Sequence, residues 1–253
     1  MTSARILVIA GSDSGGGAGV QADIRTVTLL GGHAMTAITA ITAQNTVGVQ
    51  GVHPVPTDMV LRQMDSVISD IGVDAVKIGM IGSAETASAV ANRLADLNDA
   101  PIVFDPVMVA TSGATLADAP TIAAFERLMA LATLVTPNIP ELQALGGEDI
   151  VFRFGTHVLA KGGHGEGPML TDRLIGPQGV LKSWSNARID TLHTHGTGCT
   201  LASAIATGLG QGLALRDAIE RARKYVREAL MLAPGLGHGH GPMGSPFGYH
   251  DHA

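Results

Sequence analysis

The sequence has little cysteine, few aromatic residues and a low density of charge. Among 253 residues there is 1 cysteine, and only 3% of the residues are aromatic and 15% charged. One cysteine excludes an internal disulfide and suits a reducing compartment, so we expect a cytoplasmic protein. The charged fraction lies well below the ~25% of an average soluble protein, which argues against disorder and excludes a coiled coil or charged scaffold.

Long apolar runs and clusters of basic residues are also missing. No apolar stretch approaches the ~20 residues that cross a membrane, so we expect no membrane partner. The run at residues 6–10 is too short for the core of a signal peptide. With 16 lysines and arginines against 22 aspartates and glutamates, the net charge of −6 gives no electrostatic basis for binding nucleic acid.

Glycine is abundant, and 33 glycines separate short β-branched runs from segments with helical periodicity. We expect strands at residues 5–10, 33–41, 47–55, 74–78, 101–104, 133–135, 156–160, 168–174, 179–184 and 188–192. We expect helices at residues 18–30, 57–71 with Thr57 as N-cap, 83–97, 121–131, 140–145, 198–209 and 215–232. The alternation predicts a three-layer α/β/α domain over residues 1–241, with a mostly parallel sheet covered by helices on both faces. The histidine-rich residues 242–253 are expected to form a flexible tail.

A glycine-rich loop, GSDSGGGAG at residues 11–19, follows the first expected strand. Its backbone amides could approach a ligand closely. Gly11 and Gly16 have the spacing of a P-loop, but the lysine and the serine or threonine that must follow are absent. The dinucleotide fingerprint also fails, because Val20 replaces its third glycine. A ligand-binding loop and a plain tight turn both stay open.

The segment HGTGCT at residues 195–200 precedes a helix of small residues. Glycines at a helix N-terminus expose amides and the helix dipole adds positive charge, so Gly196, Thr197 and Gly198 could form an anion hole for a phosphoryl group. The same field is expected to lower the pKa of the Cys199 thiol, which would suit it to act as a general base. The alternative for Cys199 is a small buried hydrophobic residue, which most lone cysteines are.

Asp105, Glu141 and Lys161 each come at or shortly after the end of an expected strand. Ligands of open parallel sheets bind at these carboxyl ends. Carboxylates suit magnesium and its waters, and a lysine suits phosphate oxygens. Each residue alone is readily explained as a cap, a turn or a solvated charge, but their joint placement indicates phosphoryl transfer.

Three pairs of histidines have the spacing HxH, at residues 193 and 195, 238 and 240, and 250 and 252. No further ligand set accompanies them, so we expect adventitious metal binding and not a catalytic centre. Met80 and Met108, near strand ends, are typical of core packing but could also line a flat apolar ring.

Seven ordered blocks together resemble the ribokinase superfamily and, within it, the hydroxymethylpyrimidine/phosphomethylpyrimidine kinases of thiamine biosynthesis. The blocks are AGSDSGGGAGVQAD at 10–23, TAITAQNTVGVQG at 39–51, KIGMIG at 77–82, FDPVMVATSG at 104–113, TPNIPE at 136–141, KGGH at 161–164 and HTHGTGCTLAS at 193–203. The resemblance implies a ribokinase-like fold and an ATP- and Mg²⁺-dependent kinase. Such an enzyme would phosphorylate 4-amino-5-hydroxymethyl-2-methylpyrimidine and then the resulting monophosphate. We expect a homo-oligomer, a dimer.

The resemblance also implies roles for individual residues. Gln44 would hydrogen-bond the aminopyrimidine edge, and the residues around the ring would be Gly11, Asp23, Met80 and Val107. Magnesium and its waters would be held by Asp105 and Glu141, and ATP would be contacted by Asp105, Asn138 and Lys161. The anion hole would be formed by Gly196, Thr197 and Gly198. Cys199 stands where sugar kinases of the superfamily carry an aspartate base.

One stretch departs from the family pattern. Members usually have a helix of their own between the TPNIPE and KGGH blocks, whereas only residues 146–157 are available here, so we expect that helix to be truncated. Two alternative functions stay open. One is a pyridoxal kinase of the same branch, because a pyridine with a hydroxymethyl group fits a similar pocket. The other is a non-catalytic pyrimidine-binding protein with the same fold.

Overall fold

Strands and helices alternate along the chain as expected, in a computed structural model that describes residues 3–97, 100–110, 113–164 and 167–246. The strands are β1 (Arg5–Asp13), β2 (His33–Asn45), β3 (Gly48–Pro54), β4 (Ala75–Ile78), β5 (Ile102–Phe104), β6 (Leu134–Val135), β7 (His157–Ala160), β8 (Met169–Gly176) and β9 (Gly179–Ala187). The α-helices are α1 (Gly19–Leu29), α2 (Thr57–Asp70), α3 (Ala84–Leu94), α4 (Ala119–Met129), α5 (Ile139–Ala144), α6 (Ile150–Phe154), α7 (Thr197–Gly210) and α8 (Leu215–Met231). Short 3-10 turns are η1 (Gly147–Asp149) and η2 (Gly162–His164).

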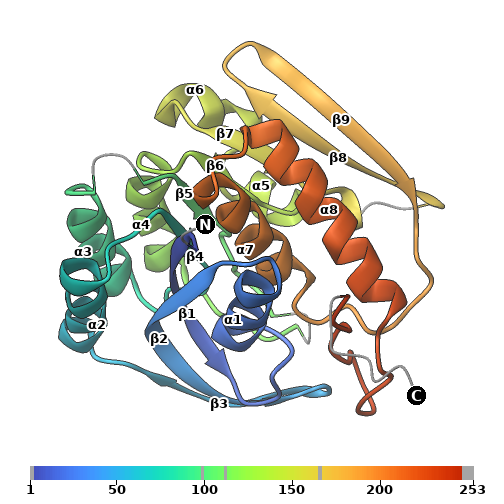
Figure 1. Ribbon diagram of the computed structural model, residues 1–253, viewed down its shortest axis with the longest axis horizontal. Helices are drawn as coiled ribbons and strands as arrows, with labels where there is room; N and C mark the ends of the chain where they lie inside the picture. The colour runs from blue at the N-terminus through green and yellow to red at the C-terminus, as the bar shows by residue number, and fades with distance from the viewer. Residues whose placement is uncertain (1–2, 98–99, 111–112, 165–166, 247–253) are drawn as a thin grey trace.

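All of these strands join one sheet in the order β3-β2-β1-β4-β5-β6-β7-β8-β9 (Figure 1). The six neighbouring strands β2, β1, β4, β5, β6 and β7 run parallel. At the two edges, β3 and the pair β8 and β9 run antiparallel to their neighbours. The sheet is therefore mostly parallel, with antiparallel hairpins closing both edges.

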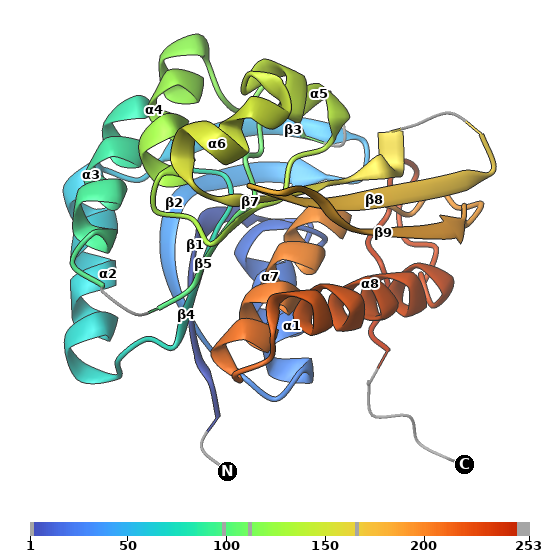
Figure 2. The same cartoon turned by 90° about the horizontal axis from the view of Figure 1, so that it is seen from above.

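Helices cover the two faces of the sheet, which gives three layers (Figure 2). One core lies between the sheet and α2, α3, α4, α5 and α6, and the other lies between the sheet and α1, α7 and α8. The central parallel strands β1, β4, β5, β6 and β7 are buried on both faces, which explains their mostly apolar sequences. This is the layer arrangement that the sequence predicts.

Small residues bring α7 close to the sheet. A Cβ atom at Gly210 would lie 2.7 Å from Cδ1 of Ile6 on β1, and one at Gly208 would lie 2.9 Å from Cβ of Ala218 on α8. Larger side chains would push α7 away from β1. These contacts hold the C-terminal turn of α7 against β1 and α8.

The strand order changes direction at β1, which pairs with β2 on one side and β4 on the other. Crevices at such switch points are the usual ligand sites of open α/β sheets. The glycine-rich loop after β1 and the turn before α7 meet at this point. The fold thus brings together the two segments that the sequence singles out.

Several sequence predictions need correction. Residues 188–192 do not form a strand, because β9 is the edge of the sheet and the chain leaves it at Ala187 to reach α7. Thr57 is the first residue of α2 and not its cap; Pro56 takes the N-cap position, and the Thr57 hydroxyl lies 3.0 Å from that of Thr86. The expected truncation is confirmed, since only η1 and the five residues of α6 fill the short connection.

The beginning of the expected tail packs against the rest of the chain. Pro242 pairs with His195 in an isolated bridge, Met243 is only 6% exposed, and the Gly244 amide donates to the Ala229 carbonyl at 2.9 Å. The apolar Met243 side chain accounts for this docking. Residues 247–253, with the third histidine pair, lie outside the described residues. Within the described residues, no helix combines the length and apolarity needed to cross a membrane.

Candidate active site

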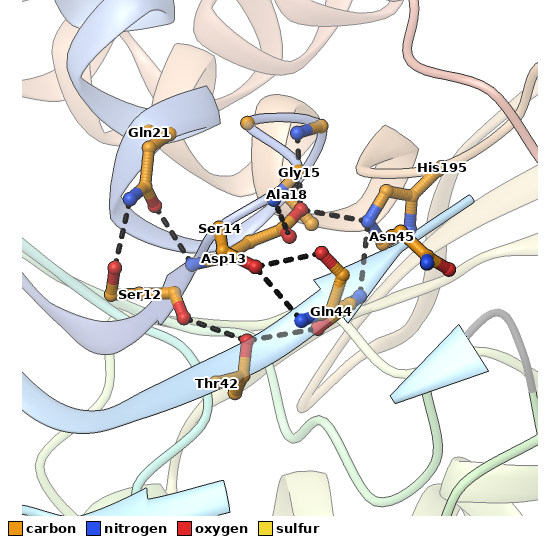
Figure 3. Close-up of polar contacts among 12 residues, drawn as sticks. Ser12, Asp13, Ser14, Gly15, Ala18, Gln21, Thr42, Gln44, Asn45 and His195 are labelled. Carbon is orange, nitrogen blue, oxygen red and sulfur yellow. Dashed lines mark hydrogen bonds and ion pairs between the residues drawn. The ribbon is translucent and has the colours of Figure 1, made fainter. Parts of the chain in front are cut away.

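The glycine-rich loop after β1 is folded around the carboxylate of Asp13 (Figure 3). Oδ1 accepts a hydrogen bond from the Gly15 amide at 2.8 Å, and Oδ2 accepts bonds from the amides of Gly17 and Ala18 at 3.0 and 2.8 Å. Oδ2 also lies 2.8 Å from Nε2 of His195 in the turn before α7. The loop amides thus satisfy an internal anion, which favours the tight-turn interpretation over a phosphate cradle.

These hydrogen bonds also fix the charge of Asp13. Burial alone would raise the pKa of its carboxyl, but the bonds from His195 and from the amides of Ala18 and Gly15 outweigh it and lower the pKa. Asp13 is therefore an ionised acceptor at neutral pH. It joins the first loop to the turn before α7.

The turn before α7 packs against the glycine-rich loop without room for side chains. Gly196 has φ 86°, and a Cβ atom there would collide with the carbonyl oxygen of Gly17. The N-cap residue of α7 is Gly196, which has no side chain to cap the helix. The first amides of a helix have no partner within it, which leaves those of Gly198 and Cys199 to a ligand, while the Thr197 amide donates to the Thr194 carbonyl at 3.3 Å.

Asp105 and Lys161 lie beside this helix terminus. The Lys161 ammonium donates to Oδ1 of Asp105 at 2.8 Å, and the Thr136 hydroxyl donates to the same oxygen at 3.1 Å. A Cβ atom at Gly198 would lie 3.2 Å from Oδ2 of Asp105 and 3.4 Å from Nζ of Lys161. The structure therefore brings a carboxylate, an ammonium and the amides of α7 to one place, as expected from the strand ends.

Glu141 is the second carboxylate of this group. It forms a capping box with Asn138 at the start of α5, in which the Glu141 amide donates to Oδ1 of Asn138 and the Asn138 amide donates to Oε2 of Glu141, both at 2.8 Å. Burial raises the pKa of the Glu141 carboxyl; the charge of Lys161 opposes this effect and that of Asp105 adds to it. Asp105 and Glu141 thus repel each other, with Lys161 as a partial counter-charge.

Cys199 is half-buried in the first turn of α7. Burial raises the pKa of its thiol to about 11, although the Lys77 charge and a hydrogen bond from the Gly19 amide act in the opposite direction. The expected lowering of this pKa is wrong. Desolvation of the thiolate, together with the nearby charges of Asp23 and Asp105, outweighs the Lys77 charge and the Gly19 amide.

A fully buried ion pair that the sequence analysis did not anticipate lies beneath Cys199. Nζ of Lys77 on β4 donates to both carboxylate oxygens of Asp23 on α1, and the Ser203 hydroxyl, one turn beyond Cys199, donates to Oδ1 of Asp23 at 2.7 Å. Asp23 has no exposed surface, so its carboxylate is not accessible to a ligand in this structure. A lysine within an apolar strand was the available signal, since a buried lysine requires a partner.

The other residues expected around a ring lie at the carboxyl ends of β1, β2, β4 and β5. Gly11 and Met80 are neighbours, because a Cβ atom at Gly11 would lie 2.6 Å from Cε of Met80. Gln44 is half-buried at an irregularity of β2, and its Nε2 atom lies 3.1 Å from Nε2 of His195. Val107 is half-buried after β5, where its amide donates to the Asp105 carbonyl at 2.8 Å.

The carboxylates fit a magnesium ion better than the histidines fit any metal. Among the described residues, no three or more His, Cys, Asp or Glu side chains gather as a ready-made metal cage. His195 contacts Asp13, and Nδ1 of His240 lies 3.0 Å from the Leu192 carbonyl, so these histidines serve structural contacts. Magnesium usually takes one or two carboxylates and completes its shell with water and phosphate oxygens, which suits the mutually repelling Asp105 and Glu141.

Comparisons with known proteins agree with this geometry. The family model described as phosphomethylpyrimidine kinase matches residues 13–244. The chain is 49% identical over 252 residues to the thiamine biosynthesis bifunctional protein ThiED of Geobacter sulfurreducens, covering 94% of this chain and 51% of that protein, so it spans about half of that relative. It is 44% identical over 261 residues to the hydroxymethylpyrimidine/phosphomethylpyrimidine kinase of Streptomyces coelicolor, with 96% of this chain and 94% of that protein covered.

Solved structures show the same fold. A Bacillus subtilis pyridoxal kinase in complex with ADP superposes with a TM-score of 0.88 at 30% identity, covering 96% of this chain and 98% of that one. A phosphomethylpyrimidine kinase from Clostridium difficile superposes with a TM-score of 0.77 at 36% identity, covering 89% and 98%. The three-layer fold is therefore ribokinase-like, as predicted. The extent of the family match and the identity to these relatives together show that the chain belongs to the phosphomethylpyrimidine kinase family.

Proposed function

We propose that the chain is an ATP- and magnesium-dependent kinase of thiamine biosynthesis, which phosphorylates hydroxymethylpyrimidine and then hydroxymethylpyrimidine phosphate. The observation that carries the proposal is the meeting of the uncapped N-terminus of α7 with Asp105 and Lys161. Phosphoryl transfer depends mainly on positioning and on stabilising the charge of the transferred group. The arrangement supplies amides, an ammonium group and carboxylates for that purpose.

In this mechanism the substrate hydroxyl attacks the γ-phosphorus of ATP, a new O–P bond forms, and the bond to ADP breaks. Cys199 accepts the hydroxyl proton in its thiolate form, which is a small fraction of the protein at neutral pH because burial raises the pKa of the thiol to about 11. The amides of Gly198 and Cys199 hydrogen-bond the transferred oxygens. The Lys161 ammonium neutralises charge on the phosphate chain, beside the Asn138 backbone with which Lys161 forms a bridge. Magnesium held by Asp105 and Glu141, partly through water, would neutralise further phosphate charge.

A pyridoxal kinase is the second candidate, favoured by the higher TM-score to the pyridoxal kinase than to the phosphomethylpyrimidine kinase. The greater identity to the latter, 36% against 30%, supports the pyrimidine as the principal substrate. Both structural relatives have the same fold, so the two candidate activities differ only in the substrate ring, a pyrimidine or a pyridine.

The test is mass spectrometry of products after incubation with ATP, magnesium and either hydroxymethylpyrimidine or pyridoxal. We expect the mono- and diphosphate of the pyrimidine, with a larger kcat/KM than for pyridoxal. Phosphate on pyridoxal alone would replace the pyrimidine proposal by the second candidate. Binding of the pyrimidine without product would instead support a non-catalytic binding protein.

We also propose that the protein is a cytoplasmic homodimer. The cytoplasmic location is supported by the single cysteine. The dimer is supported by the β2–β3 hairpin at the edge of the sheet, where apolar side chains on both strands and in the turn are exposed: Ile41, Val52 and Val47. Such an edge favours association with another chain. Light scattering on the eluting protein checks the dimer, and a monomer at micromolar concentration would refute it.

A further inference from the structure

The side-chain amide of Gln44 lies in a chain of polar contacts whose hydrogens can be counted (Figure 3). Its Nε2 is 3.1 Å from Nε2 of His195, and its Oε1 is 3.3 Å from the hydroxyl of Thr42. That hydroxyl is also 2.8 Å from the Ser12 carbonyl. Each of these contacts needs one hydrogen and one lone pair.

The contact between His195 and Asp13 decides where the histidine hydrogen lies. The Asp13 carboxylate already accepts three backbone amides and has only lone pairs to offer. Nε2 of His195, 2.8 Å from Oδ2, must therefore carry a hydrogen. A ring nitrogen that carries a hydrogen has no lone pair, so it cannot accept a hydrogen from the NH₂ group of Gln44.

The contact on the other side of the amide has the complementary conflict. The Thr42 hydroxyl has a single hydrogen, and the shorter bond, to the Ser12 carbonyl, uses it. It has no hydrogen left for Oε1 of Gln44, but it does have lone pairs that can accept one. Turning the amide by 180° resolves both conflicts: Oε1 then accepts from His195, and Nε2 donates to Thr42.

We propose that Asp13 and His195 are positioning residues that hold the Gln44 amide in this one orientation. The inference rests on the proposed function and on the expectation, from the family resemblance, that Gln44 hydrogen-bonds the aminopyrimidine edge. Asp13 orients the His195 N–H, and that N–H is shared between the carboxylate and Oε1. The remaining lone pair of Oε1 and the remaining N–H of Gln44 then have a fixed order in space.

A fixed order of acceptor and donor selects one class of ring. An amine next to a ring nitrogen offers a donor and an acceptor side by side, which pair with Oε1 and the N–H of Gln44 in one sense only. A ring without that amine leaves one half of the amide unpaired, and sites built on hydrogen bonds discriminate strongly against such analogues. The Asp13–His195 contact is thus a determinant of selectivity for the aminopyrimidine over a pyridine.

The direct test is NMR of the native protein labelled with ¹⁵N in glutamine and histidine. We expect a protonated Nε2 on His195, and NOEs from the Gln44 NH₂ hydrogens to the Thr42 side chain. An unprotonated Nε2 with NOEs from that NH₂ group to the His195 ring would overturn the proposal. This measurement needs no substrate, so it is independent of the kinase assay.

The functional test compares His195→Leu, which removes the donor, with His195→Gln, whose amide N–H can occupy a similar position. We expect His195→Leu to raise the KM for the aminopyrimidine about tenfold and to reduce the preference of the enzyme for the aminopyrimidine over pyridoxal. In His195→Gln, the KM and the preference should both stay close to those of the native protein. A change confined to kcat or to the KM for ATP would overturn the proposal, because it would show a role in the turn before α7 instead. Absence of turnover by the native protein on either ring would refute the kinase proposal, and the NMR result would still decide the amide orientation.

Discussion

Lys77 and Asp23 form an ion pair in which Nζ lies 2.9 and 2.8 Å from the two carboxylate oxygens and neither side chain has any exposed surface. The two residues are 54 positions apart in the sequence and join β4 to α1. Removing water from two charges is costly, so such a pair adds little net stability compared with apolar residues of similar size. Removing one partner is different, because it leaves an uncompensated charge in the core.

We therefore predict that Lys77→Met lowers the free energy of unfolding by about 3–5 kcal/mol. The double variant Lys77→Met/Asp23→Leu should recover most of this loss, because no charge is then left unpaired. Urea denaturation measures the free energy of unfolding of the single and the double variant. Arg153→Met is the matched control: its pair with Glu126 has side chains 50% and 52% exposed, and its loss should cost less than about 1 kcal/mol. A double variant as unstable as Lys77→Met would contradict the explanation.

The second prediction concerns the reactivity of Cys199. Because the pKa of its thiol is raised to about 11, alkylation by iodoacetamide should be slow at neutral pH and increase about tenfold per pH unit. A rate that levels off below pH 9 would show that the helix terminus outweighs burial.

A further prediction concerns the role of Cys199 in catalysis. Cys199→Ala should lower kcat by about 10²–10⁴ and leave the affinity for ATP nearly unchanged.

The raised pKa of Cys199 also predicts how the free energy of unfolding changes with pH. The folded-state pKa is above the ordinary value of 9.0, so the protonated thiol contributes stability that is present below pH 9 and lost as the pH rises towards about 11. Urea denaturation between these pH values should show that the free energy of unfolding of the native protein falls as the pH rises. The fall should be smaller in Cys199→Ala. An equal fall in both proteins would assign the effect to other groups.

Glu141→Gln separates the capping of α5 by this side chain from its proposed binding of magnesium. Glutamine can also complete a capping box, so the free energy of unfolding should change by less than about 0.5 kcal/mol. The loss of charge should raise the magnesium concentration for half-maximal rate about tenfold, which a titration of rate against magnesium measures. Glu148→Gln, on an exposed side chain, is the control and should leave the magnesium requirement unchanged.

The pH dependence of the magnesium requirement follows from the raised pKa of Glu141. As the pH falls, this carboxyl takes up a proton at a higher pH than an ordinary glutamate. The native protein should therefore need more magnesium under mildly acidic conditions. A requirement that changes equally in Glu141→Gln would show that another group is responsible.

The docked beginning of the C-terminal segment gives a further prediction. Met243 is 6% exposed, so Met243→Ala should lower the free energy of unfolding by about 2–3 kcal/mol. Met169→Ala, where the side chain is 52% exposed, is the matched control and should change it by less than about 0.5 kcal/mol. Thermal or urea denaturation compares them, and equal effects would mean that the segment is not held by Met243.

The sequence predicts the layers and the strand ends well because both depend on local patterns. Alternating apolar periods define the elements, and parallel connection brings Asp105 and Lys161 to one edge of the sheet. The helix terminus near Cys199 is also visible, since glycine and small residues mark it. These parts of the candidate site need no knowledge of distant contacts.

Other features depend on contacts between distant residues and were not predictable. The pairing of Asp23 with Lys77 requires knowing which side chains face each other across the core. The pKa of Cys199 moves opposite to the prediction because it is raised by burial of the thiol, and the sequence shows the helix N-terminus but not that burial. The glycine-rich loop could not be interpreted until Asp13 was seen to take its amides.

The burial of α7 has a consequence for the energetics of the site. From Thr200 to Gly208 this helix has buried residues at every position, so its N-terminus cannot tilt without disrupting the core. The dipoles that face an incoming anion are therefore oriented when the chain folds and not when the anion binds. An anion at this terminus meets a preorganised environment, and almost no reorganisation energy is needed as negative charge develops there.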